Sequence, residues 1–129
     1  MERSRLNEIG KVVLDAAITV HRELGPGLLK SAYQFALKKR IGIKRFVRKT
    51  KSTTVELIYK EVSLGKAYEI DLLVEEEIVI ENKSVEALLP IHTFQVITYL
   101  KLYKKKLGYL INFNVPLLKD GFKRIVNDF

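Results

Sequence analysis

Residues 68–83 constrain the fold of this chain more than any other stretch. Two short arms, 68–74 and 78–83, are apolar and rich in β-branched side chains, and the acidic run 75–77 separates them. This pattern predicts a β-hairpin with a polar turn, whose first arm begins near Lys66. Folding the hairpin about Glu76 fixes its register. The predicted cross-strand pairs are Val74 with Ile78, Leu72 with Ile80, and Asp71 with Glu81.

The predicted register brings the carboxylates of Asp71 and Glu81 together. Like charges directly opposite each other destabilise a sheet, so a positive charge is needed beside them. Lys83 follows Glu81 by two residues and shares its face, and a divalent cation held by both carboxylates would act in the same way. Because Mg²⁺ is bound by one or two carboxylates with waters and phosphate oxygens, the arrangement indicates metal-assisted attack on a phosphodiester. A solvated sheet face with the same charges is the alternative interpretation.

Residues 90–100 predict a helix that adds polar groups to this end of the hairpin. Pro90 suits the start of a helix, because its missing N–H is not needed there. Gln95 and Tyr99 are four residues apart and share one helix face, so an amide and a phenol are expected beside the carboxylates. The alternative is an exposed Gln95 and a Tyr99 that only fills the core. His92 starts this helix, and we expect it to cap or buttress the helix; contact with a phosphate or a metal-bound water is the alternative.

Together these residues resemble a known active-site signature. Asp71, then Glu81-Asn82-Lys83, then Gln95 and Tyr99 resemble the motifs of the PD-(D/E)XK nuclease superfamily, in particular its RecB-like branch. From about residue 5 to about residue 127, the chain is also similar to the small GxxExxY proteins of that superfamily. The stretches that carry this second resemblance are Val20–Leu29, Asp71–Val74, Pro90–His92, Leu110–Val115 and Leu118–Gly121.

The resemblance implies one nuclease-like domain over residues 1–129. Its fold would be α/β, with a restriction-endonuclease-like mixed β-sheet flanked by helices. It further implies hydrolysis of DNA or RNA with Mg²⁺ or Mn²⁺. The implied metal ligands are Asp71, Glu81 and the backbone carbonyl of Asn82. The implied catalytic residues are Asp71 and Glu81, together with Lys83, which positions the attacking water, and Gln95 and Tyr99, which orient the site.

Position 30 departs from the GxxExxY pattern. Gly27 and Tyr33 match the glycine and tyrosine of the pattern, but Lys30 stands where the pattern has glutamate. Lys30 therefore puts a cation where a carboxylate is expected, and its ammonium could pair with one of the two predicted metal ligands. This departure leaves a second function open, namely a catalytically weak or inactive nucleic-acid-binding or regulatory module on the same fold.

The chain is strongly basic, with a net charge of +8 and a pI near 9.7, which suits a polyanionic partner. The excess gathers between residues 38 and 51, where no acidic residue interrupts it. We predict sequence-independent, salt-sensitive nucleic-acid binding there, with a solubilising surface as the alternative. The eight basic residues of this segment are Lys38, Lys39, Arg40, Lys44, Arg45, Arg48, Lys49 and Lys51.

Length and composition bound the remaining options. The 129 residues fit one domain with a sizeable core, and the absence of cysteine excludes disulfides and thiolate metal sites. No apolar run reaches membrane-spanning length, so a soluble cytoplasmic protein without a membrane partner is expected. The oligomeric state stays open, a homodimer being one option. Besides the hairpin, we predict helices over 5–24, 29–42 and 90–104, strands over 43–51, 53–59 and 107–113, and a short last element over 122–126.

Overall fold

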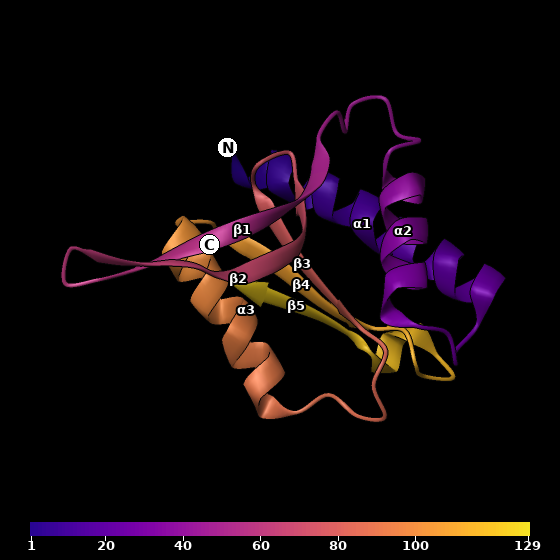
Figure 1. Cartoon of the computed structure of the whole chain (residues 1–129). Coiled ribbons are helices and arrows are strands. Elements are labelled where there is room, and N and C mark those ends of the chain that lie inside the picture. Colours follow the sequence, from indigo (N-terminus) through magenta and orange to yellow (C-terminus); the bar gives the residue numbers. More distant parts are fainter.

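A five-stranded sheet lies between two layers of helices in the computed structural model, which describes residues 1–65 and 68–129 (Figure 1). In chain order the elements are α1 (Arg3–Leu24), α2 (Lys30–Ile41), β1 (Thr50–Tyr59), β2 (Val62–Val74), β3 (Ile78–Lys83), α3 (Pro90–Tyr103), β4 (Leu107–Asn112), the 3₁₀ helix η1 (Leu118–Asp120) and β5 (Phe122–Val126). The predicted helices and hairpin are confirmed. The first arm begins earlier than predicted, because β2 starts at Val62 rather than near residue 66; the side chains at 66 and 67 lie outside the described part of the structure.

The sheet is mixed and follows the order β1-β2-β3-β4-β5. Only β3 and β4 are parallel, and the other neighbouring pairs are antiparallel. Parallel neighbours need a crossover connection, which α3 supplies. The strand β4 is buried along its whole length, as its apolar sequence predicts. The predicted α/β fold, a restriction-endonuclease-like mixed β-sheet flanked by helices, is therefore confirmed.

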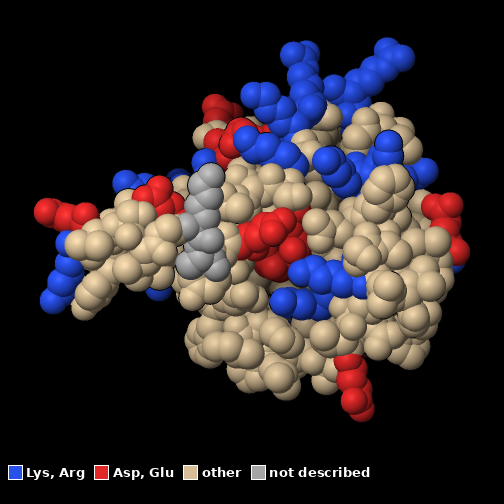
Figure 2. Space-filling view, in the orientation of Figure 1, with Lys and Arg blue, Asp and Glu red and all other residues tan. Residues whose placement is uncertain are grey.

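The strand predicted over residues 43–51 is wrong for most of its length. Residues 42–49 form the connection between α2 and β1, and only Thr50 and Lys51 belong to β1. Short-range turns fold the connection, with the N–H of Val47 donating to the carbonyl of Lys44 at 3.0 Å. Figure 2 shows Lys and Arg side chains gathered at the top of the molecule, where Figure 1 places this connection.

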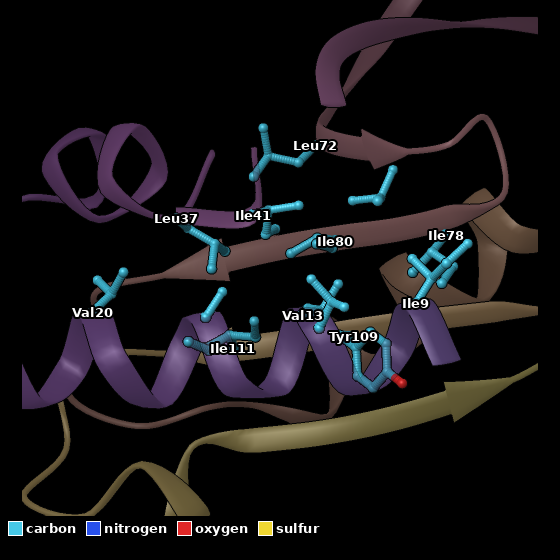
Figure 3. Packing of buried hydrophobic residues seen from close by; sticks show 14 of the residues in the cluster. Ile9, Val13, Val20, Leu37, Ile41, Leu72, Ile78, Ile80, Tyr109 and Ile111 are labelled. Carbon is cyan, nitrogen blue, oxygen red and sulfur yellow. The ribbon is translucent and has the colours of Figure 1, made fainter. Parts of the chain in front are cut away.

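Two apolar cores cover the two faces of the sheet. Between α1, α2 and one face, Ile9, Val13 and Leu37 pack against Ile80 and Ile111, as Figure 3 shows. On the opposite face, Val96 and Leu100 of α3 pack against strand residues such as Val79 and Leu110. Alternate residues of β3 thus enter different cores, which is the period-two pattern of a strand buried on both faces.

An irregularity in β2 interrupts this alternation next to Asp71. Lys51 of β1 pairs with Leu73, but Thr53 pairs with Ile70, so two steps along β1 span three steps along β2. Ile70 accordingly joins the core under α3, whereas Leu72 joins the core under α1 and α2. A β-bulge of this kind bends a strand and re-aims a side chain, and such bulges are common beside functional sites.

Candidate active site

Asp71 and Glu81 hold the open end of the β2–β3 hairpin together through their carboxylates. The predicted pairs of Val74 with Ile78 and Leu72 with Ile80 are confirmed, and the regular ladder ends at the second of them. Beyond it, the N–H of Asp71 donates to Oε1 of Glu81 at 3.1 Å. In return, Oδ2 of Asp71 accepts the N–H of Asn82 at 3.0 Å. The two carboxylates therefore take over hydrogen bonds that a continuing ladder would have made with carbonyls.

Both carboxylates are buried, with 7% of Asp71 and 2% of Glu81 exposed. Burial disfavours an ionised carboxyl, and a neighbouring negative charge disfavours it further. These two causes, burial first and the charge of Asp71 second, raise the pKa of Glu81 to about 8. When no metal ion is bound, Glu81 is therefore protonated at neutral pH. The pair has the electrostatic character of a site that attracts a cation.

Lys30, at the start of α2, supplies one such positive charge. Its Nζ lies 3.0 Å from Oδ1 of Asp71, and its side chain is about half-exposed. The same helix makes two more contacts with the site: the Lys30 carbonyl accepts Nδ2 of Asn82 at 3.1 Å, and Nε2 of Gln34 donates to the Asp71 carbonyl at 3.2 Å. Sequence reasoning missed Gln34. The available signal was its i, i+4 spacing from Lys30, which puts both on one face of α2.

Lys83, Gln95 and Tyr99 form a polar chain on the side of the sheet covered by α3. Nζ of Lys83 donates to Oε1 of Gln95 at 3.5 Å, and Nε2 of Gln95 donates to the Tyr99 hydroxyl at 3.1 Å. Burial, followed by the charge of Glu81, raises the pKa of Tyr99 to about 12, so its hydroxyl keeps its proton at neutral pH. The structure thus brings the amide and the phenol from α3 next to the Lys83 end of β3.

Asn82 faces away from this polar chain. Its side chain lies on the α2 side of the sheet, where its Nδ2 contacts the Lys30 carbonyl. Its Oδ1 is buried and has no hydrogen-bond partner in the part of the chain that the structure describes. The side chain of Asn82 is therefore a link between β3 and α2, and only its backbone is available to the side that carries Glu81 and Lys83.

The carboxylate oxygens of Asp71 and Glu81 fit a single hard cation, and the ammonium of Lys30 competes with that cation for Asp71. Mg²⁺ and Mn²⁺ prefer oxygen ligands, and each carboxylate has lone pairs beyond those used in the hydrogen bonds described above. Among the described residues, no group of three His, Cys, Asp or Glu side chains is arranged to hold a metal ion. Asp71 and Glu81 are thus the two carboxylates that are available to such a cation, and Lys30 lies against Asp71. Two carboxylates with waters and phosphate oxygens are sufficient for Mg²⁺.

The eight basic residues of the 38–51 segment are all exposed, on the last turn of α2, on the connection to β1 and on β1 itself. Acidic residues that are distant in sequence fold onto one end of the segment. Oε1 of Glu75 accepts the N–H of Arg48 at 2.5 Å and that of Lys49 at 2.7 Å, and Nζ of Lys51 lies 2.6 Å from Oε1 of Glu76. The positive charge of the 38–51 segment is therefore partly offset at its C-terminal end, although the segment itself contains no acidic residue.

The two histidines make structural contacts. Nδ1 of His92 accepts the N–H of Leu89 at 3.0 Å, which caps α3 and confirms the predicted capping role. Nε2 of His21 hydrogen-bonds with the carbonyl of Val115 at 2.7 Å and so joins α1 to the segment after β4. Neither imidazole hydrogen-bonds with Asp71 or Glu81 in the described part of the chain, although burial and then the charge of Lys83 lower the pKa of His92.

Comparison with known proteins agrees with this arrangement. Residues 7–125 match the family model described as the PD-(D/E)XK nuclease superfamily. No curated protein and no solved structure matches the chain. In the described part of the chain, no helix is both long enough and apolar enough to cross a membrane.

Proposed function

Because the chain belongs to the PD-(D/E)XK nuclease superfamily, we propose that it hydrolyses phosphodiester bonds in DNA or RNA with Mg²⁺ or Mn²⁺. Nucleases of this superfamily generally use divalent metal ions. The observation that carries the proposal is the buried Asp71–Glu81 pair, where like charge and burial raise the pKa of Glu81 to about 8. Buried acids of this kind are expensive to fold and are found where a cation or a reaction uses them. We also assign the chain to the GxxExxY group on its motifs.

In this proposal Asp71, Glu81 and the backbone carbonyl of Asn82 hold the cation. A divalent cation held there supplies a Lewis acid to a phosphate oxygen. The bulge in β2 and the hydrogen bonds between Asp71, Glu81 and Asn82 fix the two carboxylates before substrate arrives. Such preorganisation lowers the cost of reaching the transition state.

In the proposal Lys83 acts on the phosphate and the water, and Gln95 and Tyr99 orient its side chain. The Lys83 ammonium positions the attacking water and stabilises the negative charge that develops on the phosphate. Gln95 accepts from Lys83 and so orients its ammonium. The phenol of Tyr99, with a pKa raised to about 12, keeps its proton and holds the Gln95 amide in place.

Phosphates outside the reacting centre would contact the basic segment defined by Lys38, Lys39, Arg40, Lys44, Arg45, Arg48, Lys49 and Lys51. Lys30 and Lys38 lie on the same helix, eight residues apart, which corresponds to roughly 12 Å along the helix axis. The segment thus begins about 12 Å from the residue that contacts Asp71. A nucleic-acid backbone could reach both places at once, with the basic residues supplying affinity without sequence preference.

The contact of Lys30 with Asp71 favours a second candidate function. An ammonium 3.0 Å from a metal-ligand oxygen offsets part of the negative charge that would attract a cation. A chain with this ion pair would bind metal weakly and cleave slowly or not at all. It would then act as a nucleic-acid-binding or regulatory module that keeps the nuclease fold.

One assay separates the two functions. The purified chain is incubated with single- and double-stranded DNA and RNA in Mn²⁺, and Glu81→Ala serves as the control. We expect cleavage by the wild type and a loss of at least roughly 100-fold in the variant, because a carboxylate ligand is removed. Binding of the same substrates without cleavage in any divalent metal would favour the regulatory module.

A further inference from the structure

A groove lies between α3 and the ribbon of β1 and β2, next to the proposed active site. Its volume is about 570 Å³, which is in the range of small-molecule sites. Leu57 and Tyr68 of the ribbon form one wall, and Ile91 and Phe94 of α3 contribute to the other. Lys83, Gln95 and Tyr99 lie among its lining residues, so the groove and the proposed active site share three polar side chains.

The groove exposes large apolar side chains to water. The exposed fractions are 64% for Ile91, 60% for Phe94 and 45% for Tyr68. The Tyr68 ring is fixed beside the buried Tyr99 ring, with centroids 6.0 Å apart and planes tilted by 55°. Contiguous exposed apolar surface of this kind marks a binding site more often than it serves stability. Two aromatic side chains within it offer faces on which a planar group can stack.

The distribution of charge in the groove indicates what the planar group belongs to. The cation of Lys83 and the amide of Gln95 stand where the proposed reaction places a phosphate. His92 and Thr98 of α3 add two polar side chains to the lining, and the other lining residues are apolar or aromatic. A nucleotide has the same division, with an anionic phosphate joined to a flat base. Bases in a duplex are stacked on their neighbours, so only an unpaired or extruded base reaches such a surface.

We propose that this groove binds an unstacked nucleobase beside the phosphodiester at Lys83, so that the substrate is single-stranded nucleic acid or a strand with unpaired bases. The inference rests on the proposed function for the place of the phosphate. Phe94 and Tyr68 stack on the base, and Leu57 and Ile91 exclude water from its edges.

Equilibrium binding without metal tests the proposal, because it needs no cleavage. Fluorescence anisotropy in EDTA compares a labelled single-stranded oligonucleotide with a duplex of the same length, for the wild type and Phe94→Leu. Leucine keeps the apolar surface but removes the ring. We expect single-strand affinity to fall about tenfold in Phe94→Leu, with duplex affinity unchanged. The control Leu117→Ala changes an exposed apolar residue that does not line the groove, and it should match the wild type.

A second readout reports stacking directly. A 2-aminopurine base in the single strand loses fluorescence when it stacks on an aromatic ring, and we expect clearly weaker quenching by Phe94→Leu, which keeps only the Tyr68 ring, than by the wild type. Equal affinities of the wild type and Phe94→Leu for the single strand, without quenching, would overturn the base site. A dimer in sedimentation that Phe94→Leu dissociates would also overturn it, by assigning the groove to a second copy. Loss of the nuclease function alone would appear as failed cleavage with single-strand binding and quenching intact.

Discussion

The two ends of the β2–β3 hairpin place the same residue type in opposite electrostatic environments. At the turn, the side chain of Glu76 is about half-exposed and its Oε1 lies 2.6 Å from Nζ of Lys51, which lowers the pKa of Glu76. At the open end, burial beside Asp71 raises the pKa of Glu81 to about 8. The turn carboxylate is ionised and paired at neutral pH, whereas Glu81 in the absence of a cation is protonated. Position within one hairpin thus decides whether a glutamate supports folding or opposes it.

The hydrogen bonds at the two ends differ in the same way. Glu75 accepts two backbone N–H groups from the α2–β1 connection and so fastens that connection to the turn. Glu81 accepts the N–H of Asp71, a residue whose own charge repels it. An arrangement that costs stability without a compensating structural gain is expected at functional sites. The comparison therefore supports a structural role for the turn and a chemical role for the open end.

The largest effect that we expect from this comparison is on the pH dependence of stability. The folded chain holds a proton on Glu81 that the unfolded chain releases above the ordinary glutamate pKa of 4.5. Wild-type stability should therefore fall as pH rises from about 4.5 to about 8, at up to about 1.4 kcal/mol per pH unit, and level off above that range. Glu81→Gln removes this dependence and should be more stable than the wild type by roughly 2 kcal/mol or more at pH 8.

Urea unfolding in EDTA at pH 4, 6 and 8 measures this difference. Glu76→Gln is the matched control at the turn. Its carboxyl has a lowered pKa, so its contribution has the opposite sign and is lost as pH falls rather than as pH rises. A stability gain in Glu81→Gln that stays constant from pH 4 to pH 8 would contradict the assigned cause.

A smaller effect is expected from reversing the charge of Lys30. Lys30→Glu removes the ammonium that lies 3.0 Å from Asp71 and adds a third carboxylate at the site. We expect Mn²⁺ affinity to rise about tenfold, which corresponds to about 1.4 kcal/mol, because repulsion is removed and a hard ligand is gained. Calorimetric titration of Mn²⁺ into the wild type and the variant measures it.

Lys38→Glu provides the control for Lys30→Glu, because it makes the same change on the same helix at a residue that has no contact with Asp71 in the described structure. Its Mn²⁺ affinity should equal that of the wild type. Equal gains in Lys30→Glu and Lys38→Glu would mean that the net charge of the chain, and not the Lys30–Asp71 pair, controls metal binding.

Much of the fold could be predicted because its elements carry local signals. The period-two apolar arms and the acidic turn gave the register of Val74 with Ile78, and the spacing of Gln95 and Tyr99 gave one shared helix face. A strand was expected over residues 43–51 because Ile43, Phe46 and Val47 are residue types that favour strands, and this prediction is wrong. Only Val47 of the three is buried, and short-range turns fold the segment instead.

The site was predicted less completely, because its remaining features depend on tertiary packing. The bulge beside Asp71 arises from the pairing of β2 with β1, which a two-stranded register does not include. The Lys30 and Gln34 contacts require α2 to lie against the open end of the hairpin. Likewise, the hydrogen bonds from the N–H groups of Arg48 and Lys49 to Glu75 join residues that are 27 and 26 positions apart. No local pattern specifies such contacts.

The smallest expected effect separates the two ends of the basic segment. Lys49 and Lys51 both act on the charge of Glu76, and Lys51 pairs with it directly. Nucleic acid must compete with Glu76 for them, whereas Lys38 and Lys44 have no ion pair in the described part of the chain. If a single-stranded backbone contacts Lys38 and Lys44, replacing both with glutamine should reduce the slope of log affinity against log salt by about 1.4. The same change at Lys49 and Lys51 should reduce it by less. Anisotropy titrations of a single-stranded oligonucleotide between about 50 and 200 mM salt measure both slopes, and equal reductions would show that Glu76 does not withhold Lys51 from phosphate.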